Sequence, residues 1–378
     1  MNPLLEMLLA EAPPTEAEIN AFVAENEFPL VEPGRVTFVY RGEADEVLLR
    51  RWISGHSTAQ PLERIEGTDL WALTMDLPDG SRFEYKFEVV RSGTRLLVLD
   101  ELNGVLAHDP FGANSVCQGH GYGRPDWTLP EPDSRSGTLD RLLIPSRAFG
   151  ERREIQVYVP ARFRETRNYP LLIVHDGRDY LRFAELKTVL DNLIHRLEIP
   201  AMIVALTQSP DRMAEYTCSE KHARFLGEDL LPAMRETFPL LQDPANCGLL
   251  GSSLGAVAAL HAAAQNPDTF GRLFLQSGTF PFTDLGHHKK GPALDPVVKF
   301  INAYRAEPFR LAERIYMSCG VYESLIYENR SLLPVLQGQG MQVNFEEARD
   351  AHNWENWRDR LRSGLTWLFP GPLWMVYE

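Results

Sequence analysis

Residues 247–265, CGLLGSSLGAVAALHAAAQ, constrain the fold more than any other stretch of the chain. A short apolar run is followed by Gly251 and Gly255 around Ser253, and then by an alanine-rich segment. This order is typical of a strand, a tight turn and a helix, and the letters match the pattern G-x-S-x-G. Glycines are needed there because strand and helix pass too closely for side chains. We therefore predict that the Ser253 hydroxyl stands exposed at a strand end.

A five-residue pattern built from common residues also arises by chance. An ordinary glycine-rich turn between a strand and a helix would give the same letters. The catalytic interpretation therefore requires an acid and a base elsewhere in the chain.

Composition limits the classes of protein that the chain can belong to. Its 378 residues, 44% of them hydrophobic, are enough for two domains with a core in each. The formal net charge of -14 argues against nonspecific binding to nucleic acid or to an anionic membrane, because the overall field repels both.

The cysteines and the N-terminus point to the cytoplasm. Cys117, Cys218, Cys247 and Cys319 lie far apart without C-x-x-C spacing, which indicates neither a disulfide framework nor a zinc site. The N-terminal apolar run is interrupted by glutamates and lacks a basic leader, and no stretch is long enough to span a membrane. We expect a cytoplasmic location.

The first part of the chain reads as a helix followed by a β-sandwich. Residues 14–26 have helical spacing, with Thr15 as the N-cap three residues before Glu18. From Arg35 onward, short runs rich in Val, Phe, Tyr and Trp alternate with turn residues, which is typical of an antiparallel sandwich. Trp52 and Trp71 would fill its core or stack on a ligand.

A proline-rich linker separates this module from a region with a different pattern of predicted secondary structure. The predicted domains are 1–122, a linker at 123–137, and 138–378. In the last of these, apolar strands alternate with helices, which favours a mostly parallel sheet covered on both faces. Strands are expected at 142–145, 154–160, 170–174, 201–206, 247–250, 272–276, 314–319 and 342–347, and helices at 184–196 and 221–237.

An acid and a base follow two later strands. Glu323 comes just after the strand ending at Cys319, and His352 lies in the loop after the strand 342–347. Chemistry gathers at the carboxyl ends of parallel strands, and the order Ser, acid, His is that of hydrolases with a G-x-S-x-G serine. His352 would take the proton of Ser253, and Glu323 would fix the tautomer of the imidazole.

Other residues compete for these roles. His175 also lies at a strand end, but a base so early in the chain would break the usual order. Among rival acids, Asp350 is only two residues from His352, and Asp284 and Asp295 lie in no clear strand-end loop.

Two backbone donors are expected to stabilise the tetrahedral intermediate. The Leu254 N–H follows the nucleophile directly, and Gly177 would let the chain turn so that the Arg178 N–H points inward. A plain strand-ending Asp-Gly turn explains the second stretch equally well.

With these residues assembled, the second domain resembles the esterase D group of α/β hydrolases, and more narrowly the enterochelin (ferric enterobactin) esterases. The matching stretches include VHDGRDYL, LLGSSLGAVAALHAAAQ, CGVYESLIYENRSLL and HNWENWRDRL. The first module, with VTFVYRG and DELNGVLAHDPFGANSV, resembles the early-set, immunoglobulin-like sandwich that precedes the catalytic domain of those esterases. The resemblance covers nearly the whole chain.

The resemblance implies an α/β-hydrolase domain with a doubly wound, mostly parallel sheet and hydrolysis of carboxylic esters without a metal or other cofactor. In the siderophore branch, which serves iron acquisition, the substrate is the serine trilactone of a catecholate. Ser253, Glu323 and His352 match the catalytic positions of the family. One departure is the run Asp350-Ala351-His352-Asn353, where family members usually carry Gly-Gly-His-Asp, and Ser252 occupies a variable position.

A catecholate pocket should offer basic and aromatic side chains near the strand ends. The candidates are Arg178, Arg212, Glu215, Arg330 and Trp354. Arg212 and Glu215 could equally form a local ion pair, and the spacing of Trp354 and Trp357 on one helix favours core packing. The pair His287-His288 has no evident partners for a metal site.

The sequence thus predicts a serine carboxylesterase that acts through an acyl-enzyme, with a catecholate siderophore as the leading substrate. Acylated sugars or phenolic esters are the alternative substrates, and a glycan- or siderophore-binding protein on an inactive hydrolase scaffold is the alternative class. The expected partner is a small-molecule ester, with neither nucleic acid nor membrane, and a homodimer is left open.

Overall fold

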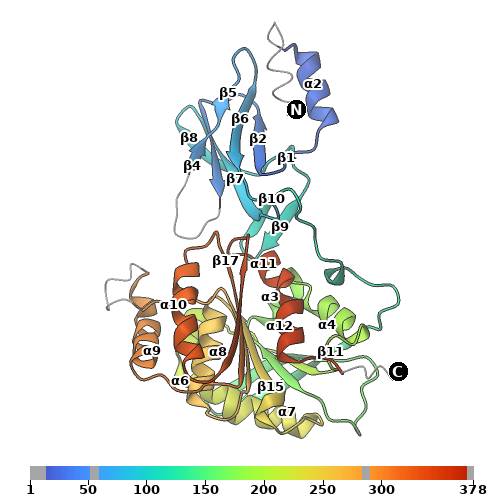
Figure 1. Ribbon diagram of the computed structural model, residues 1–378, viewed down its shortest axis with the longest axis vertical. Helices are drawn as coiled ribbons and strands as arrows, with labels where there is room; N and C mark the ends of the chain where they lie inside the picture. The colour runs from blue at the N-terminus through green and yellow to red at the C-terminus, as the bar shows by residue number, and fades with distance from the viewer. Residues whose placement is uncertain (1–13, 52–58, 283–289, 373–378) are drawn as a thin grey trace. The chain divides into compact units, whose positions relative to one another are not determined.

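The computed structural model describes residues 14–51, 59–282 and 290–372 (Figure 1). The chain divides into two compact units. Unit 1 comprises Met1–Arg124 together with two short segments, Val321–Ser324 and Arg349–Asn353. Unit 2 comprises Pro125–Gly320, Leu325–Ala348 and Trp354–Glu378.

Unit 1 begins with helix α2 (Glu16–Glu25). Thr15 caps it as predicted: its Oγ1 accepts from the Glu18 N–H at 3.3 Å, and the Glu18 carboxylate accepts from the Thr15 N–H at 2.7 Å. This reciprocal pair satisfies two donors that a helix start otherwise leaves without a partner. Ile19 and Phe22 lie on the buried side of the helix and pack with Phe28.

Two antiparallel sheets follow, so the prediction of an antiparallel sandwich is confirmed. The first has the order β1-β2-β6-β5, and the second has the order β4-β3-β7-β10-β9, with β8 also paired to β7. The strands are β1 (Leu30–Glu32), β2 (Arg35–Arg41), β3 (Glu46–Arg51), β4 (Ala59–Pro61), β5 (Glu63–Arg64), β6 (Leu70–Asp76), β7 (Arg82–Arg91), β8 (Thr94–Val98), β9 (Leu106–Asp109) and β10 (Gly112–Gln118).

The core of the sandwich is formed by side chains from both sheets. Phe38 of β2 packs against Tyr85 of β7, with ring centroids 4.8 Å apart. Trp71 is buried in the same core and donates from Nε1 to the Gly42 carbonyl at 3.1 Å, so it fills the core. Trp52 lies outside the described residues.

Unit 2 contains one sheet of eight strands in the order β11-β12-β14-β13-β15-β16-β17-β18. The strands β11 and β12 form an antiparallel edge, and every pair from β14 to β18 is parallel, as predicted. Their bounds are β11 (Thr138–Ser146), β12 (Glu151–Val159), β13 (Leu171–Val174), β14 (Ile203–Leu206), β15 (Cys247–Ser252), β16 (Arg272–Gln276), β17 (Arg314–Gly320) and β18 (Gln342–Ala348).

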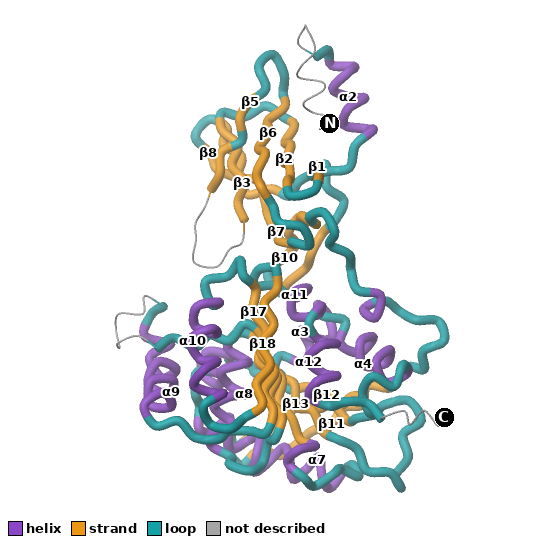
Figure 2. The backbone as a smooth tube through the Cα atoms, in the orientation of Figure 1, coloured by secondary structure: helices purple, strands orange, loops and turns teal. Residues whose placement is uncertain are grey.

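Helices cover both faces of this sheet (Figures 1 and 2). Alternation along β13 shows the division: Leu171 and Ile173 pack with the helices of one face, and Leu172 and Val174 with those of the other. One face carries α6 (Glu220–Arg224), α7 (Leu231–Thr237), α8 (Leu254–Gln265), α9 (Asp295–Ala306) and α10 (Ile326–Gln337), and the other carries α3 (Gly177–Phe183), α4 (Leu186–His195), α11 (Trp354–Asp359) and α12 (Leu361–Leu368).

The single helix predicted at 221–237 is wrong in one respect. A π-helical segment, Phe225–Leu230, separates α6 from α7. Pro232 has no N–H to donate to the Glu228 carbonyl, which instead accepts from Arg147 Nη2 at 3.0 Å. The interruption therefore follows from a missing backbone donor.

Within residues 14–51, 59–282 and 290–372, no helix is long and apolar enough to cross a membrane.

Candidate active site

Ser253 lies at the turn between the end of β15 and the start of α8. Its backbone has φ 56° and ψ -119°, a region that residues with a Cβ rarely adopt. Three backbone hydrogen bonds hold it there. Its N–H donates to the Gln276 carbonyl at 2.9 Å, and its own carbonyl accepts from the N–H groups of Ala256 at 3.2 Å and Thr279 at 3.4 Å. The side chain is half-buried at the carboxyl end of a central strand. The order of strand, turn and helix is the one that the G-x-S-x-G pattern predicts, whereas the serine is half-buried rather than fully exposed.

The two glycines of the pattern differ in how closely they are packed. A Cβ on Gly251 would lie 2.2 Å from the Gly255 carbonyl oxygen, so the strand and the helix touch at this point. A Cβ on Gly255 would lie 3.3 Å from the Cβ of His175 and 3.4 Å from Asp176 Oδ2, which is tight but not impossible. The close approach of backbone to backbone thus depends mainly on Gly251.

Glu323 and His352 form a hydrogen-bonded pair in unit 1. Glu323 follows β17 by three residues and His352 follows β18 by four. His352 Nδ1 lies 2.6 Å from Glu323 Oε2; the carboxylate is fully buried, and the imidazole is 24% exposed. Because a carboxylate accepts, the proton is assigned to Nδ1, which leaves Nε2 as an acceptor. The carboxylate therefore fixes the tautomer and the orientation of the imidazole.

The rival histidine has a different environment. His175 is completely buried, with Nδ1 3.0 Å from the Leu250 carbonyl and Nε2 3.1 Å from His222 Nε2. Burial, with help from His222, lowers the pKa of His175 to about 3. Both ring nitrogens have partners in the interior, which favours a structural role.

The rival acids also have other surroundings. Asp350 is buried and accepts from the Ala351 N–H at 2.7 Å and from the Asn353 amide at 2.8 Å. Asp295 is the first residue of α9. Asp284 lies outside the described residues, as do His287 and His288.

Of the two predicted oxyanion donors, the Leu254 N–H lies at the start of a helix, and the Arg178 N–H already donates to another acceptor. Leu254 is the first residue of α8, where an N–H has no partner within the helix. The Arg178 N–H donates to Gln208 Oε1 at 3.2 Å, so an oxyanion would have to displace that amide.

The reason for Gly177 differs from the one expected. The left-handed residue of this turn is Asp176, with φ 53°, whereas Gly177 is needed because a Cβ there would lie 2.5 Å from the Leu206 Cβ. The glycine allows a close approach to β14 rather than the turn itself.

The candidate substrate residues have protein partners. Arg212 does not pair with Glu215; it binds the buried Asp176 carboxylate with two bonds of 2.9 and 2.8 Å. Glu215 pairs with Arg153 at 2.8 Å. Arg178 pairs with Glu154 at 3.0 Å, and Arg330 pairs with Glu347 at 2.6 Å.

Trp354 lies among aromatic rings. Its ring centroid is 5.2 Å from that of Tyr180, 5.8 Å from Phe183 and 4.8 Å from Trp357. The side chain is almost completely buried, which is the core packing that its spacing favours. Contact of these five candidates with substrate stays a prediction.

Sequence reasoning missed the partners of the site residues. Arg82 contacts the loop of His352 across 268 positions of sequence, and no local pattern marks such a pairing. Asp176 could have been found, because it directly precedes the predicted turn. Among the residues that the structure describes, no group of three His, Cys, Asp or Glu side chains could hold a metal ion.

A doubly covered, mostly parallel sheet with a strained serine between strand and helix defines the α/β-hydrolase fold. Residues 146–368 match the family model described as putative esterase, and residues 35–133 match the one described as enterochelin esterase, N-terminal. Because the first match covers more than half of the chain, the protein belongs to the putative esterase family, and it is a carboxylic ester hydrolase.

Relatives resemble the chain over most of its length. The iron(III) enterobactin esterase of Dickeya dadantii is 25% identical, over 92% of this chain and 92% of the relative. That of Escherichia coli strain CFT073 is 23% identical, over 87% of this chain and 90% of the relative. The crystal structure of ferric enterobactin esterase from Salmonella typhimurium has a TM-score of 0.72 at 21% identity, covering 88% of this chain and 93% of that one.

Proposed function

We propose that the protein is a serine esterase in which Ser253 is the nucleophile, His352 the general base and Glu323 the residue that orients it. The observation that carries the proposal is the backbone of Ser253, because a left-handed φ of 56° in a residue with a Cβ is a strain that persists where function requires it. The 2.6 Å bond between His352 and Glu323 supports the assignment of base and orienting acid.

The chemistry follows from these groups. His352 Nε2 accepts the Ser253 Oγ proton as the oxygen attacks the ester carbonyl carbon. The negative charge on the carbonyl oxygen is stabilised by the Leu254 N–H at the start of α8. The tetrahedral intermediate collapses, His352 returns its proton to the leaving alkoxide, and an acyl-enzyme remains. Water then repeats the sequence, which releases the acid and restores Ser253.

The proposed substrate is the ester of a catecholate siderophore. Relatives named iron(III) enterobactin esterases match along most of the chain, including unit 1, and the enterochelin esterase N-terminal model matches residues 35–133. A cytoplasmic location and a homodimer are further predictions that belong with this function.

The mechanism is tested with Ser253→Ala and a matched control, Ser252→Ala, in the adjacent and fully buried serine. With p-nitrophenyl acetate, the wild type should show a burst of nitrophenol from acyl-enzyme formation. Ser253→Ala should lose about 10³-fold or more of kcat, and Ser252→Ala should remain within a few-fold of wild type. Unchanged turnover in a folded Ser253→Ala variant would end the proposal.

The substrate is tested separately by comparing kcat/KM for ferric enterobactin, acylated sugars and aryl esters. We expect the highest value for ferric enterobactin. A clear preference for acylated sugars or phenolic esters would contradict the siderophore assignment and leave the serine mechanism intact.

A further inference from the structure

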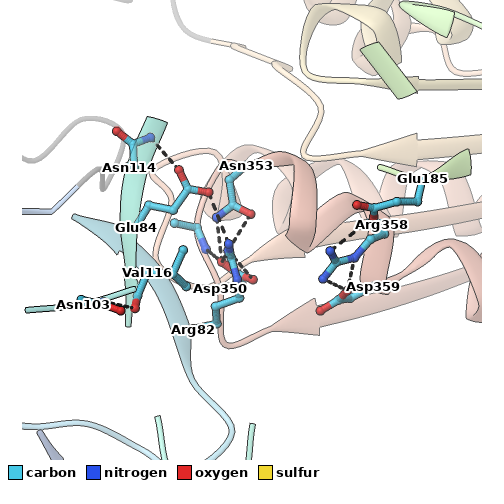
Figure 3. A network of polar contacts seen from close by, with 11 residues as sticks. Arg82, Glu84, Asn103, Asn114, Val116, Glu185, Asp350, Asn353, Arg358 and Asp359 are labelled. Atoms are coloured by element: carbon cyan, nitrogen blue, oxygen red, sulfur yellow. Dashed lines mark hydrogen bonds and ion pairs between the residues drawn. The ribbon is translucent and has the colours of Figure 1, made fainter. Parts of the chain in front are cut away.

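The first residues of β7 contact the two loops that carry Glu323 and His352, all within unit 1. Figure 3 shows the part of this network around Arg82. Alternate side chains of a strand point to opposite sides, so one short stretch of β7 can serve both loops.

Arg82 contacts the loop of His352. Its guanidinium donates from Nη1 to Asn353 Oδ1 at 3.0 Å and lies 3.4 and 3.5 Å from the two carboxylate oxygens of Asp350 (Figure 3). Its backbone N–H donates to the Arg349 carbonyl at 2.8 Å. Arg82 is only 2% exposed, so these charged contacts are shielded from water and from salt.

Asp350 connects Arg82 to the residues on both sides of His352. One of its carboxylate oxygens also accepts from the Ala351 N–H at 2.7 Å and from the Asn353 Nδ2 at 2.8 Å. The residues on both sides of His352 are therefore bound to a single carboxylate that Arg82 contacts.

The neighbours of Arg82 in sequence contact the loop of Glu323. Ser81 Oγ lies 2.6 Å from the Tyr322 hydroxyl, and the Phe83 ring meets the Tyr322 ring edge-on at 6.5 Å. The Tyr322 N–H donates to the Asp350 carbonyl at 3.1 Å, which joins the two loops directly.

We propose that Arg82 is a positioning residue for catalysis: through Asp350 and Asn353 it fixes the loop that aims His352. The proposal rests on the proposed function, in which His352 is the base. A planar guanidinium holds its partners in a defined geometry that a flexible ammonium cannot reproduce. Because misplacing a catalytic group by about 1 Å costs on the order of 10²-fold in rate, a loosened loop should slow the chemistry while binding persists.

Arg82→Met removes the guanidinium and keeps the length of the side chain. The burst phase with p-nitrophenyl acetate gives the acylation rate constant and the dissociation constant of the ester separately. We expect the rate constant to fall by about 10- to 100-fold and the dissociation constant to stay within about threefold. Arg82→Lys should recover part of the rate.

The matched control is Arg272→Met. Arg272 is also buried and paired, with Nη1 2.8 Å from Glu313 and Nε 3.1 Å from the Leu368 carbonyl, but it lies at the opposite, amino end of β16. Removing Arg272 leaves Glu313 without this partner, and removing Arg82 leaves both Asp350 and Glu84 without it, so both variants should have a lower melting temperature. Only Arg82→Met should slow acylation. Equal acylation losses in the two variants would reduce Arg82 to a purely structural role and overturn the proposal.

Asp350→Asn is the second variant, and it decides the matter if Arg82→Met does not fold. It keeps the shape of the side chain and removes the charge of one of the two carboxylates that face Arg82; the other, Glu84, lies 3.5 Å from Arg82 Nη2 and is left in place. It should slow acylation, and the double variant Arg82→Lys/Asp350→Asn should be no slower than the worse single variant, because both act on one contact. Wild-type acylation in Asp350→Asn, or additive losses in the double variant, would contradict the proposal. Activity in Ser253→Ala would instead refute the proposed function.

Discussion

Two histidines that both follow strands of the same sheet show how environment assigns a role. The His352 side chain is about a quarter exposed, and its Nδ1 is hydrogen-bonded to a buried carboxylate. His175 is completely buried, and its nitrogens face a carbonyl and a second imidazole. The half-buried imidazole bonded to a carboxylate is suited to the proposed proton transfer, and the enclosed imidazole is suited to a structural role in the interior.

His175 should make unit 2 sensitive to acid. Its pKa is lowered to about 3 in the folded protein, so between that value and the ordinary pKa of about 6.5 the unfolded chain binds the extra proton. The contribution of His175 to the free energy of unfolding is fully present above pH 6.5. It is lost as the pH falls, at roughly 1.4 kcal/mol per pH unit. Urea unfolding between pH 4 and 7 should show this slope, and His175→Gln should flatten it. Parallel pH profiles for the two proteins would contradict the assignment.

At the scale of elements, the strand, turn and helix around Ser253 together hold the proposed nucleophile. Strand β15 pairs with β13 and β16 along its length, and α8 packs nearly all of its residues into the core. The turn between them cannot relax, because both flanking elements are fixed. This is why a strained φ persists at Ser253.

Gly251→Ala and Gly255→Ala should therefore differ in their effects on stability and activity, although both glycines belong to the same G-x-S-x-G pattern. The methyl group at 251 would meet the Gly255 backbone at 2.2 Å and force strand and helix apart, and we expect a loss of about 3 kcal/mol with at least a 100-fold loss of kcat/KM. At 255 the nearest atoms are 3.3 Å away, and the better helix propensity of alanine offsets crowding by up to about 1 kcal/mol. Urea unfolding and esterase assays measure both effects, and comparable losses in the two variants would be contrary to this expectation.

At the scale of the molecule, the division into units does not follow the chain. The strands β17 and β18 belong to unit 2, but the short segments after them, which carry Glu323 and His352, belong to unit 1. A sandwich that looks like an accessory module in sequence therefore contacts the loops that carry Glu323 and His352.

The two units should respond to pH in opposite directions. In unit 1, burial raises the pKa of Asp100 to about 6, against the opposing bond from the Tyr85 hydroxyl at 2.6 Å. The folded state therefore holds the proton more tightly than the unfolded chain, whose aspartate has a pKa of about 3.9. Stability from this group is full below that value and is lost as the pH rises through 6. In calorimetry, the unfolding temperature of unit 1 should fall as the pH rises from 4 to 6.5. The substitution Asp100→Asn should remove most of that fall. An unfolding temperature of unit 1 that rises over this pH range in both the wild type and Asp100→Asn would refute this prediction.

Much of the architecture could be predicted because it depends on residues that are close together in the sequence. Apolar runs and turn residues predict the sandwich and the parallel sheet, and β16 begins and ends where the pattern places it. The capping box at Thr15 is equally local. The π segment before α7 was not predicted, although Pro232, which lacks the N–H, is visible in the sequence; only the replacement donor to the Glu228 carbonyl, Arg147, is distant in sequence.

The sequence by itself determined the order Ser253, Glu323, His352 and the strand ends on which they lie, because periodicity and turn chemistry act over a few residues. Only the tertiary structure decided that Glu323 bonds to His352, that His175 is enclosed, that Arg212 binds Asp176 and that Arg82 contacts the loop of His352. Such pairings join side chains separated by tens to hundreds of positions. They exist only once the chain has folded and water has been excluded from around them, and no short pattern encodes that event.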